Sequence, residues 1–468
     1  MNKEFDVICI GAGPGGYVSA IKASQSGKRV AVIDISKEKV GGVCLNEGCI
    51  PTKAIIHSSE IYANIKKYSQ FFGFGAKINK PDMKQLLVFN REVVEELRKG
   101  IFYLFKKYGV TFIEGKAILN SPKEINLELK EGGRETLKAK DIILATGSRP
   151  QELTGMEFDK KRIISSSQAI KLDYIPESIL IVGAGAIGIE FGSLFNNLGT
   201  RVSIVEAEKN ILPNQDLDIS KSLKHNFKKR KIDIYNESRI IEVDKQKGLL
   251  RAKVDTPGGK KELDVELILV AVGRIPSTDF QDFSKVGIEV KKGNFLKVDN
   301  YMRTTADNVY AIGDIANRKM LAHIAYEQAQ IAVMTLCGKK PPPINLLNIP
   351  TIVYCDIQVA SVGLTEEEVK RQGFNYLVSR QYFRSNSSSV INRQIDGFVK
   401  IIADKKTHQF LGIHILGFEA SEIIHQFVVA KSGGLLVDDM AKFVYGHPTF
   451  SEIAKDACLS VFNKPIHG

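Results

Sequence analysis

The stretch Val7-Ile8-Cys9-Ile10-Gly11-Ala12-Gly13-Pro14-Gly15-Gly16 decides the fold of the first part of the chain. An apolar strand runs directly into a GxGxxG turn, a helix follows to about Ser26, and the next strand ends in Asp34. This order is typical of a dinucleotide-binding βαβ unit. In such a unit the glycines let a pyrophosphate approach the helix N-terminus, and the acid accepts hydrogen bonds from the ribose hydroxyls. The segment therefore predicts a dinucleotide site that uses Gly11, Gly13, Gly16 and Asp34.

The same pattern occurs a second time. The strand Ile179–Val182 precedes Gly183-Ala184-Gly185-Ala186-Ile187-Gly188, and the strand Arg201–Val205 ends in Glu206. In both copies 23 residues separate the first glycine from the acid, so a chance match is excluded in practice. Similar late strands close the copies, and the first copy carries 46 extra residues. We expect a second dinucleotide site at Gly183, Gly185, Gly188 and Glu206, with Gly273 at its closing turn. Thr146 and Gly147 stand at the closing turn of the first site.

A third segment, residues 308–314, is expected to contribute to the first nucleotide site. Residues 308–314 end in Gly-Asp after an apolar strand, and Asp314 is placed to bind ribityl or phosphate oxygens of a flavin. A helix over Leu321–Leu336 follows, with Ala322 at its start, and Pro341-Pro342-Pro343 indicates a linker. Strands within Thr351–Val362 and Phe398–Phe418, then helices Ala420–Ser432 and Ser451–Phe462, indicate a separate α+β domain.

These patterns predict an α/β fold with two Rossmann-like dinucleotide-binding domains, one for FAD and one for NAD, and a separate C-terminal α+β domain. The expected boundaries are 1–150 for the FAD-binding domain, which carries the cysteine pair, 151–275 for the NAD-binding domain, 276–345 for a central segment completing the FAD site, and 346–468 for the C-terminal domain.

Composition excludes several classes of function. The 468 residues are 44% hydrophobic and 25% charged, as in ordinary globular proteins, and no apolar run is long enough to span a membrane. The formal charge of +12 comes from lysines spread along the chain, which favours a solvated surface over nucleic-acid binding. Six scattered cysteines and a start without a signal peptide indicate a reducing compartment, and we expect a cytoplasmic protein.

Two of the cysteines lie five residues apart in Gly41-Gly42-Val43-Cys44-Leu45-Asn46-Glu47-Gly48-Cys49-Ile50-Pro51-Thr52-Lys53. They can approach for a disulfide only if the turn departs from helix geometry, which Gly48 permits. A metal half-site and a pair of structural thiols are the alternatives. His57 alone does not supply the further ligands that a metal would need, and no metal site is expected. Directly after a dinucleotide fingerprint, the pair is best explained as a redox centre.

Along its full length the chain resembles the pyridine nucleotide-disulfide oxidoreductases, and its cysteine motif is most similar to members that oxidise dihydrolipoamide. The resemblance implies that Cys44 is the interchange thiol that meets substrate and that Cys49 is the charge-transfer thiolate against FAD. It also implies that Lys53 lies near the flavin and pairs with Glu190, two residues after the second fingerprint.

The C-terminal motif Gly446-His447-Pro448-Thr449-Phe450-Ser451-Glu452 completes the resemblance. It implies that Glu452 orients His447 as general base and that the histidine reaches the active site of the other subunit. A homodimer is therefore expected, with the C-terminal α+β domain, residues 346–468, as its dimerisation domain. Two residues depart from the usual pattern. Tyr445 stands where the dihydrolipoamide-oxidising members often have histidine, and Cys355 begins a segment that usually reads Thr-x-Pro-Glu.

The cofactor and substrate follow from particular residues. Glu206 bonds a free ribose 2′-hydroxyl and repels a 2′-phosphate, which favours NAD over NADP. Thr52 and Ile453 differ from the residues usual in glutathione reductases, and the C-terminus lacks the cysteine pair of mercuric reductases. The implied reaction is oxidation of dihydrolipoamide by NAD⁺, with lipoylated acyltransferase or glycine-cleavage carrier domains as partners. Another NAD(P)H-dependent disulfide reductase, or a non-catalytic redox sensor, is the alternative.

Overall fold

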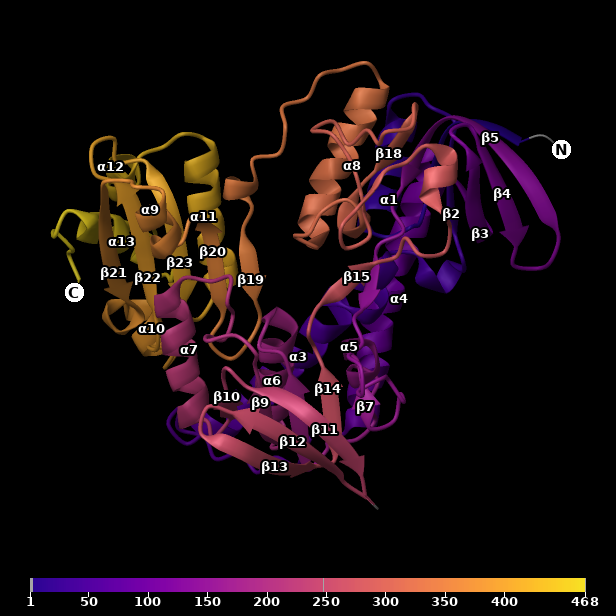
Figure 1. The fold of residues 1–468 in the computed structure, drawn as a ribbon. Helices are drawn as coiled ribbons and strands as arrows, with labels where there is room; N and C mark the ends of the chain where they lie inside the picture. Colours follow the sequence, from indigo (N-terminus) through magenta and orange to yellow (C-terminus); the bar gives the residue numbers. More distant parts are fainter. Residues whose placement is uncertain (1–2, 247, 468) are drawn as a thin grey trace.

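The computed structural model describes residues 3–246 and 248–467 of the chain. Figure 1 shows three bodies: one around β2 and α1, a second around β9 and β14, and a third around β20 to β23. A long strap leads from α8 to β19 and contains the Pro341-Pro342-Pro343 stretch that the sequence indicates as a linker.

The first body is a parallel sheet with a central strand that continues into the first fingerprint. Strand β1 pairs in parallel with β2 and with β5, and β3 and β18 lie outside them, so the order is β3-β2-β1-β5-β18. Beyond the parallel part, β3 and β5 continue into an antiparallel sheet with β4 between them. The strands are β1 (Lys3–Ile10), β2 (Val30–Asp34), β3 (Thr111–Ser121), β4 (Glu124–Leu129), β5 (Arg134–Leu144) and β18 (Val309–Ala311).

Residues 276–345 are built into this first body. Strand β18 extends its sheet beyond β5, and helix α8 (Ala322–Leu336) packs beside α1 (Pro14–Gln25). The short elements β15 (Arg274–Pro276) and β6 (Ser148–Pro150) pair antiparallel and connect the first two bodies. Segments that lie far apart in the sequence thus share one nucleotide fold.

The extra residues of the first copy form helices between β2 and β3. They are the one-turn η1 (Lys37–Lys39), α2 (Gly42–Glu47), α3 (Cys49–Tyr68) and α4 (Met83–Tyr108). Asp82 caps α4 by accepting hydrogen bonds from two backbone N–H groups, and Gly109 ends it in a left-handed conformation. This insertion carries the cysteine pair.

The second body repeats the parallel arrangement, with strand order β10-β9-β8-β14-β7. A three-stranded antiparallel sheet, β11-β12-β13, lies next to it. The elements are β7 (Ile163–Ile164), α5 (Ser166–Ala169), β8 (Ser178–Val182), α6 (Ala186–Asn197), β9 (Arg201–Val205), α7 (Leu217–Lys229), β10 (Asp233–Tyr235), β11 (Arg239–Lys245), β12 (Leu250–Thr256), β13 (Gly259–Val265) and β14 (Leu267–Val270).

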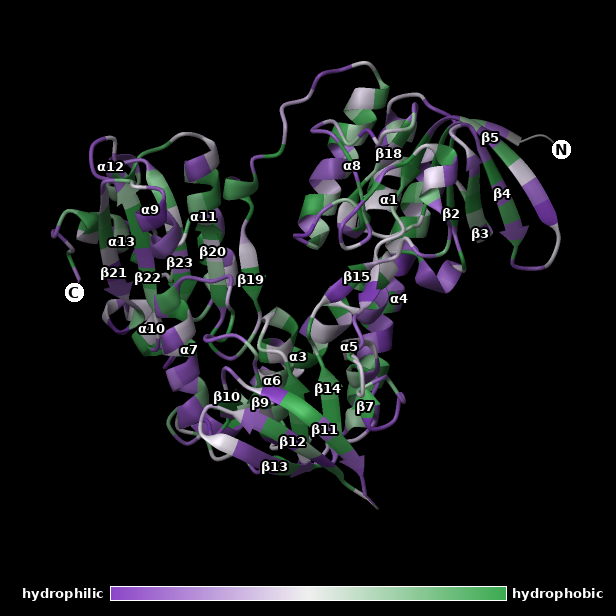
Figure 2. Cartoon of the chain, in the orientation of Figure 1, coloured by the Kyte–Doolittle hydropathy of each residue, from purple (hydrophilic) through white to green (hydrophobic). Residues whose placement is uncertain are grey.

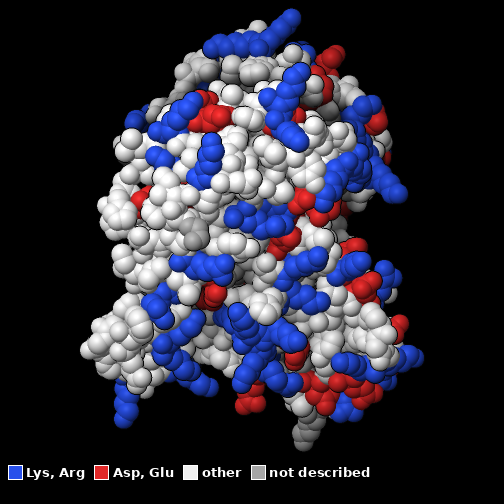
Figure 3. Space-filling view, turned by 90° about the vertical axis from the view of Figure 1, so that its left-hand side faces the viewer, with Lys and Arg blue, Asp and Glu red and all other residues white. Residues whose placement is uncertain are grey.

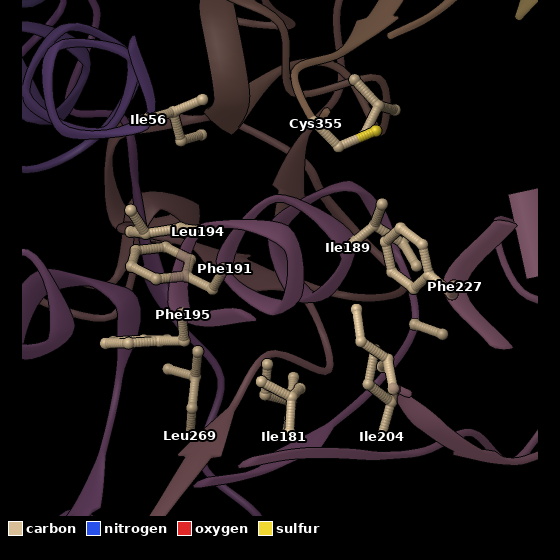
Figure 4. Close-up of a cluster of buried hydrophobic side chains, with 14 of the residues drawn as sticks. Ile56, Ile181, Ile189, Phe191, Leu194, Phe195, Ile204, Phe227, Leu269 and Cys355 are labelled. Carbon is tan, nitrogen blue, oxygen red and sulfur yellow. The ribbon is translucent and has the colours of Figure 1, made fainter. Parts of the chain in front are cut away.

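The core of the second body forms because α6 and the strands bury apolar side chains on each other. Figure 4 shows Phe191, Leu194 and Phe195 of α6 near Ile181 and Leu269 of the sheet. All five side chains are almost fully buried, and Figure 2 shows β14 coloured as apolar. Burying a side chain of this size contributes about 1.5–3 kcal/mol, so this cluster is a major source of stability.

The third body is an antiparallel sheet covered by helices. Its strand order is β19-β20-β23-β22-β21, and α11 and α13 pack on it. The predicted α+β domain is therefore present, although the sequence analysis did not identify β21. The elements are β19 (Thr351–Val353), β20 (Val359–Gly363), α9 (Glu366–Arg371), β21 (Tyr376–Tyr382), α10 (Ser387–Ile391), β22 (Phe398–Asp404), β23 (Phe410–Leu416), α11 (Ala420–Ser432), α12 (Val437–Lys442) and α13 (Glu452–Val461).

A buried charge cluster joins the second and third bodies. Lys400 on β22 is 1% exposed, and its Nζ lies 2.8 Å from Asp216, 2.7 Å from Asp218 and 2.7 Å from Glu366. Asp216 caps α7 in the second body and is fully buried. Because a buried charge is costly unless it is paired, these ion pairs favour one arrangement of the two bodies.

The surface carries the expected distribution of charge. Figure 3 shows Lys and Arg spread over one face of the molecule, with Asp and Glu among them. Among the described residues, no helix is both long enough and apolar enough to cross a lipid bilayer.

Candidate active site

The two cysteines meet at a break between two helices. Cys44 lies in α2 and Cys49 is the first residue of α3. Gly48 separates the helices with φ −136° and ψ −116°, and a Cβ there would lie 2.9 Å from the carbonyl oxygen of Val43. The chain therefore turns back tightly at a position where only glycine fits without a shift of the backbone, and both sulfurs are free thiols.

The surroundings of the two thiols differ. A hydrogen bond from Cys44 and the positive charge of Lys53 lower the pKa of Cys49 to about 7, against the effect of burial. The same hydrogen bond, together with burial, raises the pKa of Cys44 far above its usual range. Cys49 also lies at the N-terminus of the 20-residue helix α3, where the helix dipole favours a thiolate. Cys49 is therefore the more acidic thiol of the pair, and Cys44 donates the hydrogen bond that favours its thiolate.

The turn between the cysteines is fixed by its own side chains. Asn46 donates to the carbonyl oxygens of Val40 at 3.0 Å and Gly42 at 2.8 Å, and it accepts a 2.6 Å hydrogen bond from Arg98 of α4. Glu47 forms an ion pair with Lys39 at 2.7 Å and another with Lys171, just after α5, at 3.2 Å. These contacts hold the two sulfurs in one relative position.

Lys53 and Glu190 form an ion pair beside Cys49, although 137 residues separate them in the sequence. Lys53 Nζ lies 2.9 Å and 2.8 Å from the two carboxylate oxygens of Glu190. The backbone N–H of Tyr354 donates to the same carboxylate at 3.1 Å, and the Tyr354 ring centroid lies 4.9 Å from Nζ. Burial lowers the pKa of Lys53, but Glu190 outweighs this effect and the pKa is raised overall. Lys53 thus keeps a positive charge next to Cys49.

The first fingerprint has the shape that a dinucleotide requires. Gly11 has φ +97°, and a Cβ there would lie 2.4 Å from the carbonyl oxygen of Ala145. A Cβ on Gly16 would meet the backbone of Gly11, so helix and strand pack together only with glycine at this position. Asp34 accepts a 2.7 Å hydrogen bond from the N–H of Ala12, which fixes one carboxylate oxygen at the ribose position.

The second fingerprint has the same geometry. Gly183 has φ +101°, and Gly188 packs against its carbonyl oxygen. No heavy atom lies within 4 Å of the Cβ position of Gly185, so the turn is open where a pyrophosphate would approach. Glu206 accepts a 2.5 Å hydrogen bond from the N–H of Ala184, as Asp34 does in the first copy. Both turns thus fit the dinucleotides that the sequence predicts.

Asp314 lies in a buried network that the sequence analysis did not find. The hydroxyl of Ser148 donates to Asp314, and Arg274 donates to the hydroxyl of Ser148 at 2.8 Å and to its carbonyl oxygen at 2.6 Å. Burial raises the pKa of Asp314, although Ser148 and Arg274 oppose this effect. Thr146 lies on the same loop and donates to a backbone carbonyl at 2.8 Å. The network joins the end of β5, β6 and β15 at the junction of the two nucleotide folds.

The remaining predicted cofactor residues lie at turns of these folds. Gly147 and Gly273 have φ of +73° and +128°, directly before β6 and β15, and Ala322 is the first residue of α8.

His447 and Glu452 lie at the far end of the third body. His447 Nδ1 is 2.9 Å from one oxygen of Glu452, and the N–H of Thr449 donates to the other at 2.7 Å. These partners lower the pKa of Glu452 despite its burial. The His447 side chain is 67% exposed, and among the described residues no hydrogen bond or ion pair joins it to the cysteine pair of the same chain. Figure 1 shows α13, which follows this motif, on the opposite side of the molecule from α1 and α8.

The two departures from the family pattern lie outside the redox turn. Tyr445 packs on the core of the third body, where burial raises its pKa to about 12. Cys355 is fully buried, and its thiol donates to a backbone carbonyl at 2.9 Å. The next residue, Asp356, accepts from Arg230 at 3.2 Å and its N–H donates to Ser193 at 3.0 Å. This segment fastens the third body to the second.

Comparison with known proteins supports this geometry. Residues 5–329 match the pyridine nucleotide-disulphide oxidoreductase family, and residues 349–458 match its dimerisation domain. The mitochondrial dihydrolipoyl dehydrogenase 1 of Arabidopsis thaliana is 38% identical over all of this chain and 92% of its own. A dihydrolipoyl dehydrogenase of Rhizobium etli is 35% identical over both full chains. The crystal structure of LpdA from Mycobacterium tuberculosis superimposes with a TM-score of 0.89 and 25% identity, covering 97% of this chain and 99% of that one.

The chain belongs to the pyridine nucleotide-disulphide oxidoreductase family. The predicted family, the α/β fold, the oxidoreductase class and the cofactors FAD and NAD are thereby confirmed. The match to the dimerisation domain supports the predicted homodimer.

Proposed function

We propose that the protein is a dihydrolipoyl dehydrogenase, which oxidises protein-bound dihydrolipoamide to lipoamide with NAD⁺ as acceptor. The observation that carries this proposal is the polarised cysteine pair, with Cys49 as thiolate beside Lys53 and Cys44 as its neutral partner. Full-length relatives from plants and bacteria that bear this name support the choice of substrate.

We assign the two fingerprints to the two cofactors. FAD, when bound, supplies the electron transfer between the cysteine pair and the nicotinamide. The residues proposed to hold FAD are Gly11, Gly13, Gly16, Asp34, Lys53, Thr146, Gly147, Asp314 and Ala322. The residues proposed to hold NAD are Gly183, Gly185, Gly188, Glu190, Glu206 and Gly273.

The proposed reaction begins with removal of a proton from a substrate thiol by the partner subunit's His447, whose ring is oriented by Glu452. The substrate thiolate attacks Cys44, the disulfide between the cysteines breaks, and Cys49 leaves as a thiolate. Lys53 and the N-terminus of α3 stabilise this leaving group, which is why its pKa matters for the step.

The second substrate sulfur then closes the product ring. It releases its own thiol proton to water and attacks the first substrate sulfur, the bond to Cys44 breaks, and the partner subunit's His447 gives Cys44 the proton that it removed in the first step. The substrate leaves as a cyclic disulfide, and two electrons remain on the cysteine pair. The resulting thiol and thiolate correspond to the protonation pattern described above.

Glu206 supports NAD as the acceptor because its carboxylate lies at the end of β9 and repels a 2′-phosphate. Lipoylated acyltransferase or glycine-cleavage carrier domains are the proposed partners, since they present dihydrolipoamide on a flexible arm. A reducing compartment such as the cytoplasm suits a chain in which Cys9, Cys355 and Cys458 are buried free thiols.

The direct test is an activity panel with the purified yellow holoprotein. We expect fast NAD⁺ reduction by dihydrolipoamide, its loss in Cys44→Ser, and its retention in Cys337→Ser, which replaces a half-buried cysteine outside the redox turn. Activity with glutathione disulfide in place of lipoamide would reject the proposed substrate, and activity with NADPH in place of NADH would reject the proposed cofactor. Either result would leave the proposed electron transfer through Cys44 and Cys49 in place. Bound cofactors without any turnover would favour a redox sensor.

A further inference from the structure

One residue from each of the three bodies meets the others next to the redox turn. Lys53 lies on α3 in the first body, Glu190 on α6 in the second, and Tyr354 directly after β19 in the third. Helix α6 packs against both α3 and β19, as Figure 1 shows. The Tyr354 backbone N–H donates to one carboxylate oxygen of Glu190 at 3.1 Å, and its ring centroid lies 4.9 Å from Lys53 Nζ. Tyr354 thus contacts both partners of the ion pair.

The backbone on both sides of Tyr354 is fixed by other contacts. Val353 and Cys355 are buried in the core of the second body, and the Cys355 thiol donates to a backbone carbonyl oxygen at 2.9 Å. The N–H of Asp356 donates to the Ser193 hydroxyl of α6 at 3.0 Å. The Tyr354 ring therefore has a defined position relative to α6 and its carboxylate.

The ring of Tyr354 provides Lys53 with a second partner besides Glu190. A lysine ammonium within about 6 Å of an aromatic ring centroid is attracted by the negative ring face, and the distance here meets this condition. The Lys53 side chain is 31% exposed, and a lysine side chain is a flexible four-carbon chain. The ion pair alone would leave its ammonium free to turn toward water, whereas the ring restricts this movement.

The position of the Lys53 ammonium matters for Cys49. The two residues are one helical turn apart on α3, a spacing that places both side chains on the same face of the helix. The attraction between a cation and a thiolate weakens with their distance. A group that restrains the Lys53 ammonium therefore also affects how strongly the Cys49 thiolate is stabilised.

We propose that Tyr354 is a positioning residue of the redox site, whose ring holds the Lys53 ammonium beside Cys49 while its backbone N–H holds Glu190. The docking of the third body on the second then determines the charge next to the thiolate. The inference rests on the thiolate role of Cys49 in the proposed function and not on the identity of the dithiol. The alternative is a role in packing alone, since the ring also packs on the core of the second body.

The test measures the pKa of Cys49 in the FAD-loaded protein, in a Cys44→Ser background that cannot form the disulfide. Two pH midpoints report it: that of the long-wavelength absorbance of a thiolate against the flavin, and that of iodoacetamide labelling of Cys49. Tyr354→Leu keeps the backbone N–H and an apolar side chain but removes the ring. We expect both midpoints to rise by about 0.5 pH units, the size of a partly exposed cation–π contact. Tyr354→Phe keeps the ring and should have the midpoints of the parent.

A graded series separates the ring face from packing. Phenylalanine with one, two or three ring fluorines at position 354 keeps the ring shape but weakens its attraction for a cation stepwise. The midpoints should rise in the same steps. The matched control is Tyr382→Leu on β21, at the opposite edge of the same sheet, which removes a ring whose centroid lies 4.7 Å from the guanidinium of Arg384. This control should leave both midpoints unchanged.

The proposal is overturned if Tyr354→Leu leaves the midpoints unchanged or lowers them, if the fluorinated series shows no trend, or if Tyr354→Phe shifts them as far as Tyr354→Leu. Should Tyr354→Leu fail to fold, the fluorinated series decides alone. A parent without the long-wavelength band would reject the proposed role of Cys49, and with it this inference. Because no dithiol is used, a preference for another substrate would reject the proposed function and leave this inference intact.

Discussion

Replacing Lys53 by Met removes the cation that stabilises the Cys49 thiolate. In the parent the pKa of Cys49 is about 7, mainly through the hydrogen bond from Cys44, with Lys53 lowering it further and Glu190 acting in the opposite direction. Without Lys53 the carboxylate of Glu190 is unopposed, and we expect the Cys49 pKa to approach the ordinary thiol value of about 8.5. At pH 7 the thiolate fraction would then fall from about one half to about 3%.

The assay is the rate of iodoacetamide labelling of Cys49 as a function of pH, followed by peptide mass spectrometry. It is performed in a Cys44→Ser background, in which no disulfide forms and the serine hydroxyl can still donate to Cys49. Because labelling requires the thiolate, the midpoint of the pH profile gives the pKa directly. Lys66→Met, an exposed position on the same helix α3, is the matched control and should leave the midpoint unchanged.

Replacing Glu190, the other partner of the ion pair, should shift the pKa of Cys49 in the opposite direction from Lys53→Met. Glu190→Gln removes a charge that raises the pKa of Cys49, so its midpoint should move below that of the parent. Since Glu190 is only 7% exposed, Lys53→Met also leaves a buried carboxylate without its cation, and Lys53→Met/Glu190→Gln should be more stable than Lys53→Met alone. An unchanged midpoint in Lys53→Met, or one that moves in the same direction in both single variants, would refute the reasoning.

Three further predictions concern the buried charge cluster around Lys400 and the second fingerprint. Lys400→Met leaves the buried Asp216 without its cation and should lower the free energy of unfolding by about 3–5 kcal/mol, measured by denaturant titration with fluorescence. Glu206→Ala should reduce the preference for NADH over NADPH, measured as the ratio of kcat/KM values. The pKa of Glu366 is lowered to about 2, so this group stabilises the fold above pH 4.5 and the contribution is lost as pH falls through 2. Glu366→Gln should therefore show a weaker dependence of stability on pH between those values, measured by thermal melting.

Local sequence patterns could predict those parts of the fold in which functional residues recur at a fixed spacing. Each fingerprint needs a strand, a glycine turn, a helix and an acid within about 23 residues, so both copies are visible without any tertiary information. The predicted strand Arg201–Val205 and the predicted helix Ala420–Ser432 have the same bounds in the structure. Strands such as β11 were missed because most of its side chains are exposed or half-buried, which leaves no clear hydrophobic pattern.

The site could be predicted only where a motif or the family resemblance pointed to it. The proximity of Lys53 and Glu190 followed from the resemblance, because nothing in the spacing of residues 137 apart indicates contact. Tyr354 and Arg274 have no local signature: each reaches the site through the docking of one body on another.

The proposed mechanism requires a composite site, with the cysteine pair from one subunit and His447 from the other. Heterodimers of a Cys44→Ser chain and a His447→Gln chain, purified with two different tags, test this claim most directly. Each homodimer of these variants should be nearly inactive with dihydrolipoamide and NAD⁺. The heterodimer contains one intact site if the histidine acts across the interface, and the account predicts about half of the parent activity. A heterodimer as inactive as the two homodimers would contradict it.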